Sequence, residues 1–184
     1  LPTTVMVAGS SFAIRSDFRA VLDALAALTD PDLTQQEQYV ACLQILYPRW
    51  KELPGANAAL RAAFTFINEG KEDEQQGFRP RLVDWEQDAA LIAPAVDKVL
   101  GYSCRRCGYL HWWEFIAMLD DIPETVSLHR IMQYRIIDTT NKSLSKEQVA
   151  FYKAMQRYYK IQQVEENEEL IKALKEGRDP SPYL

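Results

Sequence analysis

Cys104, Cys107 and His111 have the residue types and the spacing that could hold a metal ion. Two cysteines separated by two residues are half of a common zinc site, and His111 follows Cys107 by about one helical turn. Structural zinc takes four ligands, so the fourth would be Cys42, His129 or a carboxylate. No second cysteine or histidine pair is placed to close the site. We therefore expect no metal and no cofactor, and the alternative is a loop whose cysteines have no role.

His111 and Glu114 could instead act as a general base and the residue that orients it. They are three residues apart, which places them on one face of a helix. The other interpretation is a hydrogen-bonded polar pair in a mostly apolar helix. Asp84 and Asp88 are explained by a helix N-terminus, where carboxylates interact favourably with the macrodipole. The chain has no GxSxG nucleophile motif and no glycine-rich phosphate loop. We therefore expect that the protein is not an enzyme.

The elements that would position these residues are mostly helices. Apolar residues recur at helical spacing after capping signals such as Thr34 with Glu37. Residues 5–14 predict a small hairpin with its turn at Gly9-Ser10. The expected fold class is mainly α, a single-domain multi-helix bundle with a small N-terminal β-hairpin. The expected helices begin near Asp17, at Thr34, near Ala56, at Asp84, at Tyr109, at Pro123 and at Ser145.

The chain divides into residues 1–160, a helical domain with the N-terminal hairpin, and residues 161–184, a charged C-terminal helical extension and tail. We expect the seventh helix to continue through the acidic residues 165–169 to Gly177. Val164, Ile171 and Leu174 keep a thin apolar line in this extension. Such a line is typical of docking on a partner or a second subunit, so these three residues are candidate contact points.

Residues 110–115, Leu-His-Trp-Trp-Glu-Phe, form the densest aromatic cluster of the chain. Packing in a central, buried helix is the simplest interpretation. Adjacent residues of a helix point about 100° apart, so one of the two tryptophans could face outward as an interface anchor. We take Trp112 as the candidate contact residue.

Length and charge narrow the class of protein. A chain of 184 residues fits one domain. Its net charge of −5 argues against nucleic acid as the main partner, because phosphate binding needs clustered lysines and arginines. No run of about 18 apolar residues appears, so we expect no membrane partner. The three cysteines do not suggest a disulfide framework, so a reducing cytosol is expected.

Five stretches together resemble the bacteriophage gene-product-fifteen family, which occurs in tailed phages and prophages of Gram-positive bacteria. The resemblance covers most of the chain, from about Val5 to Tyr159, and residues 109–115 are its most specific part. This chain differs in its Cys-Arg-Arg-Cys-Gly segment and in its longer charged extension. The stretches, in order, are residues 16–19 (Ser-Asp-Phe-Arg), 66–71 (Phe-Ile-Asn-Glu-Gly-Lys), 84–89 (Asp-Trp-Glu-Gln-Asp-Ala), 109–115 (Tyr-Leu-His-Trp-Trp-Glu-Phe) and 134–135 (Tyr-Arg).

The resemblance implies a non-enzymatic phage protein with a predominantly helical fold. It implies a tail assembly chaperone that binds the tape measure protein in the bacterial host cytoplasm until tail tube protein replaces it. A holdase of this kind works in several copies, so we expect a homo-oligomer. The alternatives are a structural tail or head–tail component of the virion, or a metal-binding regulator that uses Cys104, Cys107 and His111.

Overall fold

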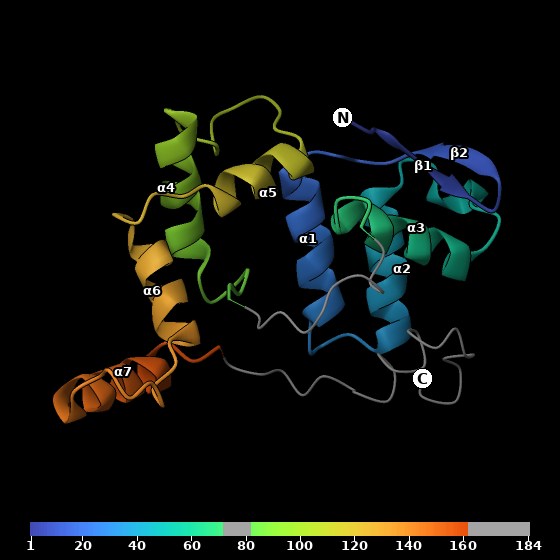
Figure 1. Cartoon of the computed structure of the whole chain (residues 1–184). Coiled ribbons are helices and arrows are strands. Elements are labelled where there is room, and N and C mark those ends of the chain that lie inside the picture. The colour runs from blue at the N-terminus through green and yellow to red at the C-terminus, as the bar shows by residue number, and fades with distance from the viewer. Residues whose placement is uncertain (72–81, 162–184) are drawn as a thin grey trace.

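The computed structural model describes residues 1–71 and 82–161, and these residues are mainly α-helical (Figure 1). The predicted fold class, a mainly α single domain with an N-terminal hairpin, is confirmed. The elements described are β1 (Thr4–Val7), β2 (Ser10–Ala13), α1 (Phe18–Thr29), α2 (Gln35–Leu46), the 3-10 helix η1 (Trp50–Glu52), α3 (Ala56–Ile67), α4 (Ala89–Leu100), α5 (Trp112–Asp120), α6 (Ser127–Ile136) and α7 (Lys146–Tyr158).

The hairpin turn lies one residue earlier than predicted. β1 and β2 pair antiparallel from Thr4 with Ala13 to Val7 with Ser10, which leaves Ala8 and Gly9 as the turn. Both have positive φ, 47° for Ala8 and 84° for Gly9. Positive φ at both central positions defines a two-residue type I′ turn, whose backbone twist matches that of the flanking strands. The predicted Gly9-Ser10 turn is therefore wrong.

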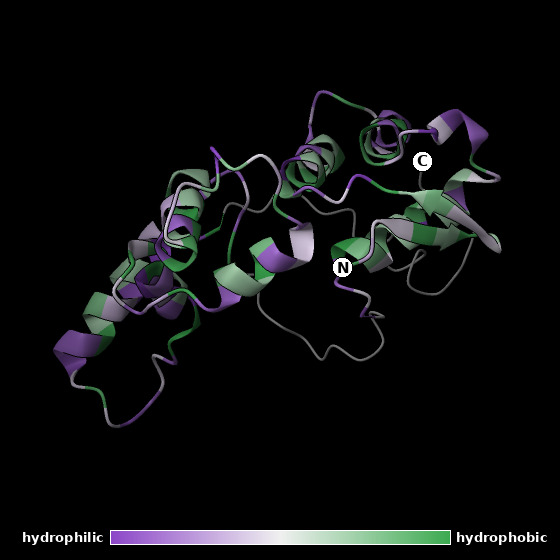
Figure 2. Ribbon diagram, turned by 90° about the horizontal axis from the view of Figure 1, so that it is seen from above, coloured by the Kyte–Doolittle hydropathy of each residue, from purple (hydrophilic) through white to green (hydrophobic). Residues whose placement is uncertain are grey.

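The hairpin and α1, α2 and α3 form one group, on the right of Figure 1. α1 and α2 lie side by side, and β1 packs on α3. The predicted caps are confirmed: the Asp17 side chain accepts from the backbone N–H of Arg19, and Thr34 and Glu37 form a capping box. Helices of both groups carry hydrophobic and hydrophilic residues together, as Figure 2 shows, so each buries one face.

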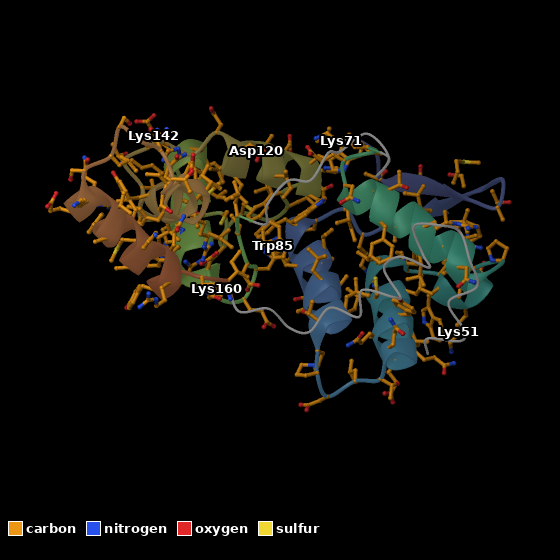
Figure 3. All side chains as sticks on the ribbon, turned by 60° about the horizontal axis from the view of Figure 1, so that its bottom comes forward. Lys51, Lys71, Trp85, Asp120, Lys142 and Lys160 are labelled. Carbon is orange, nitrogen blue, oxygen red and sulfur yellow. The ribbon has the colours of Figure 1, made fainter. Side chains whose placement is uncertain are left out.

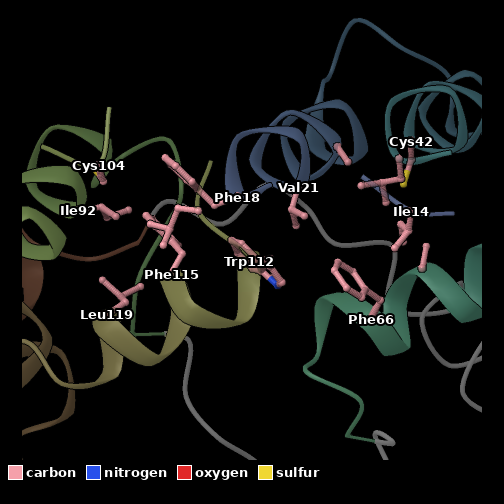
Figure 4. Packing of buried hydrophobic residues seen from close by; sticks show 14 of the residues in the cluster. Ile14, Phe18, Val21, Cys42, Phe66, Ile92, Cys104, Trp112, Phe115 and Leu119 are labelled. Carbon is pink, nitrogen blue, oxygen red and sulfur yellow. The ribbon is translucent and has the colours of Figure 1, made fainter. Parts of the chain in front are cut away.

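The second group contains α4, α6 and α7, and α5 joins it to the first group (Figure 1). Phe115 of α5 stacks on Phe18 of α1 with ring centroids 4.5 Å apart, and its other neighbour in the stack is Trp112. Trp85 packs against Trp112 and lies between the two groups in Figure 3. Figure 4 shows the resulting core, which runs from Ile14 across Phe18 and Phe115 to Leu119. One hydrophobic core therefore spans both groups.

α5 begins at Trp112, three residues after the predicted start at Tyr109. The backbone N–H of Phe18 donates to the carbonyl of Leu110, and the N–H of Trp112 donates to the carbonyl of Ser16. These bonds hold the residues before α5 in an extended conformation beside the start of α1. His111 is consequently the N-cap of α5 rather than a residue of its helical face.

α4, α6 and α7 also differ from their predicted bounds. α4 begins at Ala89 instead of Asp84, whose carboxylate accepts from the backbone N–H groups of Glu86 and Gln87 in the preceding turn. The predicted start of α6 at Pro123 is a turn, and the helix begins at Ser127. α7 has the predicted cap but ends at Tyr158, so it does not continue into the acidic run. The predicted extension to Gly177 lies otherwise outside the described residues.

Candidate functional site

The side chains of Cys104, Cys107 and His111 are directed to different protein groups. Nε2 of His111 lies 2.8 Å from the carbonyl of Pro2, and its Nδ1 accepts from the backbone N–H of Trp113 at 3.1 Å. Both imidazole nitrogens are therefore engaged in the fold. Across residues 1–71 and 82–161, no three histidine, cysteine or acidic side chains are grouped as a metal site would require.

Arg19 organises the turn that contains the two cysteines. Its Nη2 donates to the carbonyls of Cys104 and Cys107 at 3.0 and 2.6 Å and lies 3.4 Å from the sulfur of Cys107. Its other amino group pairs with Asp17, the cap of α1. Burial, followed by the hydrogen bond and the charge of Asp97, raises the pKa of the Cys104 thiol to about 11. A protonated, enclosed thiol is a packing group rather than a nucleophile.

His111 and Glu114 do not form the pair predicted as one alternative. The hydrogen bonds of His111 go to Pro2 and Trp113, whereas Glu114 is exposed on α5. The histidine instead joins the N-terminal residues of the chain to the first turn of α5. Its role in the described structure is that of a helix cap.

Trp112 and Trp113 complete the C-terminal end of α3. Nε1 of Trp112 donates to the carbonyl of Ile67 and Nε1 of Trp113 donates to that of Phe66, both at 2.8 Å. The last carbonyls of a helix lack partners within the helix. The indole of Trp112 donates to one of them, and the indole of Trp113 gives the carbonyl of Phe66 a second donor beside the backbone N–H of Glu69. Trp112 is only 2% exposed. The prediction of Trp112 as an outward-facing contact residue is therefore wrong, because the ring is needed inside.

Sequence analysis missed a buried ion pair between Asp88 and Arg135. Nη1 of Arg135 lies 2.6 Å from Oδ2 of Asp88 and Nη2 lies 2.9 Å from Oδ1. Arg135 also donates to the carbonyls of Leu82 and Tyr159, at 2.6 and 2.8 Å. The pair thus fixes the start of α4, the end of α6 and the end of α7 together. Asp88 belongs to this pair, and the predicted explanation by a helix N-terminus alone was incomplete.

α7 packs against α6 through one face only. Tyr134 of α6 makes ring contacts with Phe151, Tyr152 and Tyr159. The half-buried residues of α7 recur at helical spacing, and none of its residues is fully buried. These half-buried residues are Val149, Tyr152, Met155, Gln156 and, just after the helix, Tyr159.

Beside this packed face, α7 carries an exposed apolar stripe, whose Phe151 still touches Tyr134, and then an exposed basic stripe. Phe151, Ala154 and Tyr158 are exposed at positions i, i+3 and i+7, which places them on one line along the helix. Phe151 is 49% and Tyr158 is 77% exposed. The exposed residues Lys146, Lys153 and Arg157 follow a second line at i, i+7 and i+11. We call these six residues the outer face of α7.

The outer face is the strongest candidate site in the described part of the chain. α7 projects from the lower end of α6 in Figure 1, away from α1, α2 and α3. An aromatic ring that is mostly exposed leaves apolar surface available to a partner. The signal was present in the sequence as the spacing of Phe151, Ala154 and Tyr158. Sequence analysis did not consider this side of the helix.

The other predicted contact points, Val164, Ile171 and Leu174, lie outside the described residues. Among the described helices, none combines the length and the apolar character that crossing a bilayer requires.

Comparison with known proteins gives one match. The family model described as Bacteriophage Gp15 protein matches residues 1–161, which include every element described above. No curated protein matches the chain. No solved structure matches it either.

Proposed function

Since this chain belongs to the bacteriophage Gp15 protein family, which indicates a phage structural or assembly protein, we propose that it is a tail assembly chaperone. In this proposal the protein is not an enzyme. It binds the tape measure protein in the cytoplasm of the bacterial host during tail morphogenesis. Tail tube protein later displaces it, and the chaperone acts as a homo-oligomer along the extended tape measure.

The outer face of α7 is the observation that supports this proposal. A chaperone for a long helical protein needs apolar surface that is exposed before the partner arrives. Phe151 and Tyr158 provide such surface from a helix that buries no residue fully. Large aromatic side chains contribute much of the binding energy in protein interfaces, because they bury a large area with few rotatable bonds.

The basic stripe beside these rings adds selectivity. Lys146, Lys153 and Arg157 are exposed on a protein whose overall charge is −5. A local positive stripe on a negative protein attracts acidic segments and repels basic ones. We therefore propose that the bound segment of the tape measure is a helix with an apolar line flanked by acidic side chains.

Co-expression with the tape measure protein tests the proposal. The full chain should keep the tape measure soluble and should co-purify with it, whereas the double variant Phe151→Ser/Tyr158→Ser should lose both effects. Both residues are exposed, so the variant should keep the helical circular dichroism spectrum of the parent. Equal recovery of soluble tape measure with the parent, with the variant and without either would contradict the chaperone function.

Tyr102→Ser is the matched control. Tyr102 is 58% exposed and follows the C-terminal end of α4. The end of α7 instead lies near the start of α4, where the side chain of Gln87 donates to the carbonyl of Lys160. The loss of Tyr102 removes an exposed aromatic ring of similar size without touching the outer face. Co-purification should be unchanged. Abundant protein in purified virions, measured by mass spectrometry, would favour a structural tail or head–tail component instead.

A further inference from the structure

Two helices of the chain expose charges of opposite sign at the same spacing. The outer face of α7 carries Lys146 and Lys153, and α1 with its C-cap carries Asp23 and Asp30, in each case seven residues apart. Within residues 1–71 and 82–161, none of these four side chains makes an ion pair. One oxygen of Asp30 accepts from the backbone N–H of Asp32, which leaves the other for a partner. Seven residues of an α-helix span about 10.5 Å, so the two sets of charges can face each other in register.

The signs of these charges determine which helices can meet. Two copies of α7 would place basic side chains opposite one another, and two copies of α1 would place aspartates opposite one another. A contact of α7 with α1 instead brings opposite charges together. Within one chain α7 projects away from α1, as Figure 1 shows, so this contact needs a second copy of the chain.

Both faces have the same three parts around the helix. On α7, the exposed Ala150 and Ala154 separate the basic stripe from the aromatic rings. On α1, the exposed Ala26 separates the aspartates from Leu22 and Thr29. Alanines allow two helix axes to approach closely, because the interaxial distance depends on the side chains at the contact. We call five residues the acidic face of α1: Leu22, Asp23, Ala26, Thr29 and Asp30.

The order of these parts fixes the relative direction of the two helices. Seen from outside with the N-terminus at the bottom, successive residues of a right-handed helix advance to the right by 100°. The outer face of α7 therefore has its basic stripe on the left and its rings on the right. The acidic face of α1 has Leu22 and Thr29 on the left and its aspartates on the right. Turning one face onto the other exchanges left and right when the helices are parallel, so only parallel helices bring the basic stripe to the aspartates.

We propose that α7 of one copy packs in parallel on α1 of a second copy, with the outer face on the acidic face. Lys146 pairs with Asp23 and Lys153 pairs with Asp30, and Phe151 lies on the side of Leu22 and Thr29. Each contact leaves α1 of the first copy and α7 of the second copy free. Further copies can therefore add in the same way, as in other heterologous contacts.

This contact covers the exposed rings of α7 before another partner arrives. The acidic face of α1 has the pattern that we propose for the bound segment of the tape measure, an apolar line flanked by acidic side chains. A tape measure helix would therefore compete with α1 of the neighbouring copy for the outer face. That competition rests on the proposed function, whereas the contact between copies does not.

Sedimentation velocity with charge-reversed variants of the full chain tests the contact. The parent should associate as its concentration rises. Lys146→Glu/Lys153→Glu should raise the dissociation constant about ten-fold or more, because like charges then face across the contact, and Asp23→Lys/Asp30→Lys should do the same. Both variants should keep the helical circular dichroism spectrum. A parent that stays monomeric at about 1 mM, where even weak complexes are populated, would overturn the proposal, as would variants that associate like the parent.

Mixing the two variants shows whether α7 meets α1. In an equimolar mixture, the unchanged α7 of one variant can bind the unchanged α1 of the other, and the two reversed faces also have opposite charges. The mixture should therefore associate like the parent, although neither variant does so alone. High salt should weaken the association of the parent, because the pairs are exposed and screened. A mixture that does not associate, with both helical spectra retained, would overturn the proposal.

Arg61→Glu/Lys98→Glu is the matched control. Both residues are exposed, on α3 and α4, and belong to neither face. This variant changes the net charge of the chain as much as Lys146→Glu/Lys153→Glu does, and it should associate like the parent. An equal loss of association in the control would show that net charge is responsible, and the proposal would fail.

The tape measure protein separates this contact from the proposed function. If the parent associates but neither co-purifies with the tape measure nor keeps it soluble, the contact between copies stands and the chaperone function fails. If the tape measure co-purifies with a parent that stays monomeric in its absence, the chaperone function stands and the contact between copies fails.

Discussion

The guanidinium of Arg135 donates two parallel hydrogen bonds, of 2.6 and 2.9 Å, to the carboxylate of Asp88. The side chains of Arg135 and Asp88 are only 6% and 4% exposed. Asp88 also accepts from the backbone N–H of Asp84 at 2.9 Å. Every polar atom of a buried ion pair needs a partner, because desolvation otherwise outweighs the attraction. Among the described residues, no buried side-chain nitrogen or oxygen atom lacks one.

Loss of one partner of this pair should destabilise the fold strongly. Arg135→Met leaves the carboxylate of Asp88 buried without its counter-charge, at a cost of about 3–5 kcal/mol in the free energy of unfolding. Asp88→Asn should cost a comparable amount. The double variant Asp88→Asn/Arg135→Met should cost less than the sum of the two, because it no longer buries an unpaired charge. Urea unfolding measures all three, and strict additivity would contradict the coupling.

The indole N–H of Trp113 should contribute measurably through the end of α3. Trp113→Phe removes the donor to the carbonyl of Phe66, which should lower the free energy of unfolding by about 1 kcal/mol. Trp112→Phe should cost more, since it removes the donor to Ile67 and also leaves space at a buried position. Thermal unfolding of both variants provides the comparison. Parent-like stability of Trp112→Phe would contradict the arrangement.

An asparagine at position 8 should stabilise the turn of the hairpin. Ala8 has a φ of 47°, which a residue with a Cβ adopts at a cost of about 1–2 kcal/mol. Asparagine tolerates this conformation better and precedes glycine in the preferred type I′ turn. Ala8→Asn should therefore raise the free energy of unfolding by about 0.5–1 kcal/mol. Ala13→Asn, at an exposed position of β2, is the control and should not stabilise the protein.

The three cysteines should differ in reactivity towards iodoacetamide at neutral pH. Burial raises the pKa of Cys42 to about 12, and burial with Asp97 raises that of Cys104 to about 11. Only the thiolate reacts, so both should be protected in the folded protein. Cys107 is partly exposed and should react first. Mass spectrometry after timed labelling identifies the site, and in urea all three should react alike. Labelling of Cys104 before Cys107 would contradict the structure.

Acid should lower the free energy of unfolding, because it protonates carboxylates whose pKa is lowered in the folded protein. Burial acts to raise the pKa of Asp97, but hydrogen bonds from the backbone and side chain of Cys104 and from Ser103 outweigh it. Hydrogen bonds from Thr34 lower the pKa of Glu37. A lowered folded pKa stabilises the fold above the unfolded pKa, and this stability is lost as the pH falls through the folded value.

Unfolding in urea at a series of pH values measures this effect. Stability should fall below the usual pKa range of Asp and Glu, near pH 4. Asp97→Asn should flatten the acid side of the profile, because residue 97 then no longer titrates. An unchanged slope in that variant would show that the hydrogen bond to Cys104 does not shift the pKa of Asp97.

Local signals in the sequence were sufficient for the helix caps. Asp17, Thr34 and Ser145 each accept from a backbone N–H two or three residues later, so every partner is visible in a short window of sequence. The apolar spacing then predicted the seven α-helices of residues 1–71 and 82–161 and the mainly α class. The family resemblance supplied the phage context that spacing alone does not contain.

Features that depend on distant partners were not predictable in the same way. The start of α5 is set by backbone hydrogen bonds to Ser16 and Phe18. The helical spacing of apolar residues extends back to Tyr109, so the sequence pattern alone predicted an earlier start. The pair of Asp88 with Arg135 joins residues 47 positions apart, and no spacing rule connects them. Trp112 was taken as a candidate contact residue because its hydrogen-bond acceptor, the carbonyl of Ile67, lies 45 residues earlier and no local pattern reveals it.

The two indoles at the end of α3 also impose an order on how the chain matures during translation. Their acceptors are made 45 and 47 residues before the donors, so α3 is synthesised before these two hydrogen bonds can form. Nascent chains emerge N-terminus first, at about 5–20 residues per second. The hydrogen bonds between the two indoles and α3 can therefore form only several seconds after α3 has been made. A truncation upstream of Trp112 would leave the end of α3 without both indole donors, and such a fragment should be digested faster by protease than the full chain.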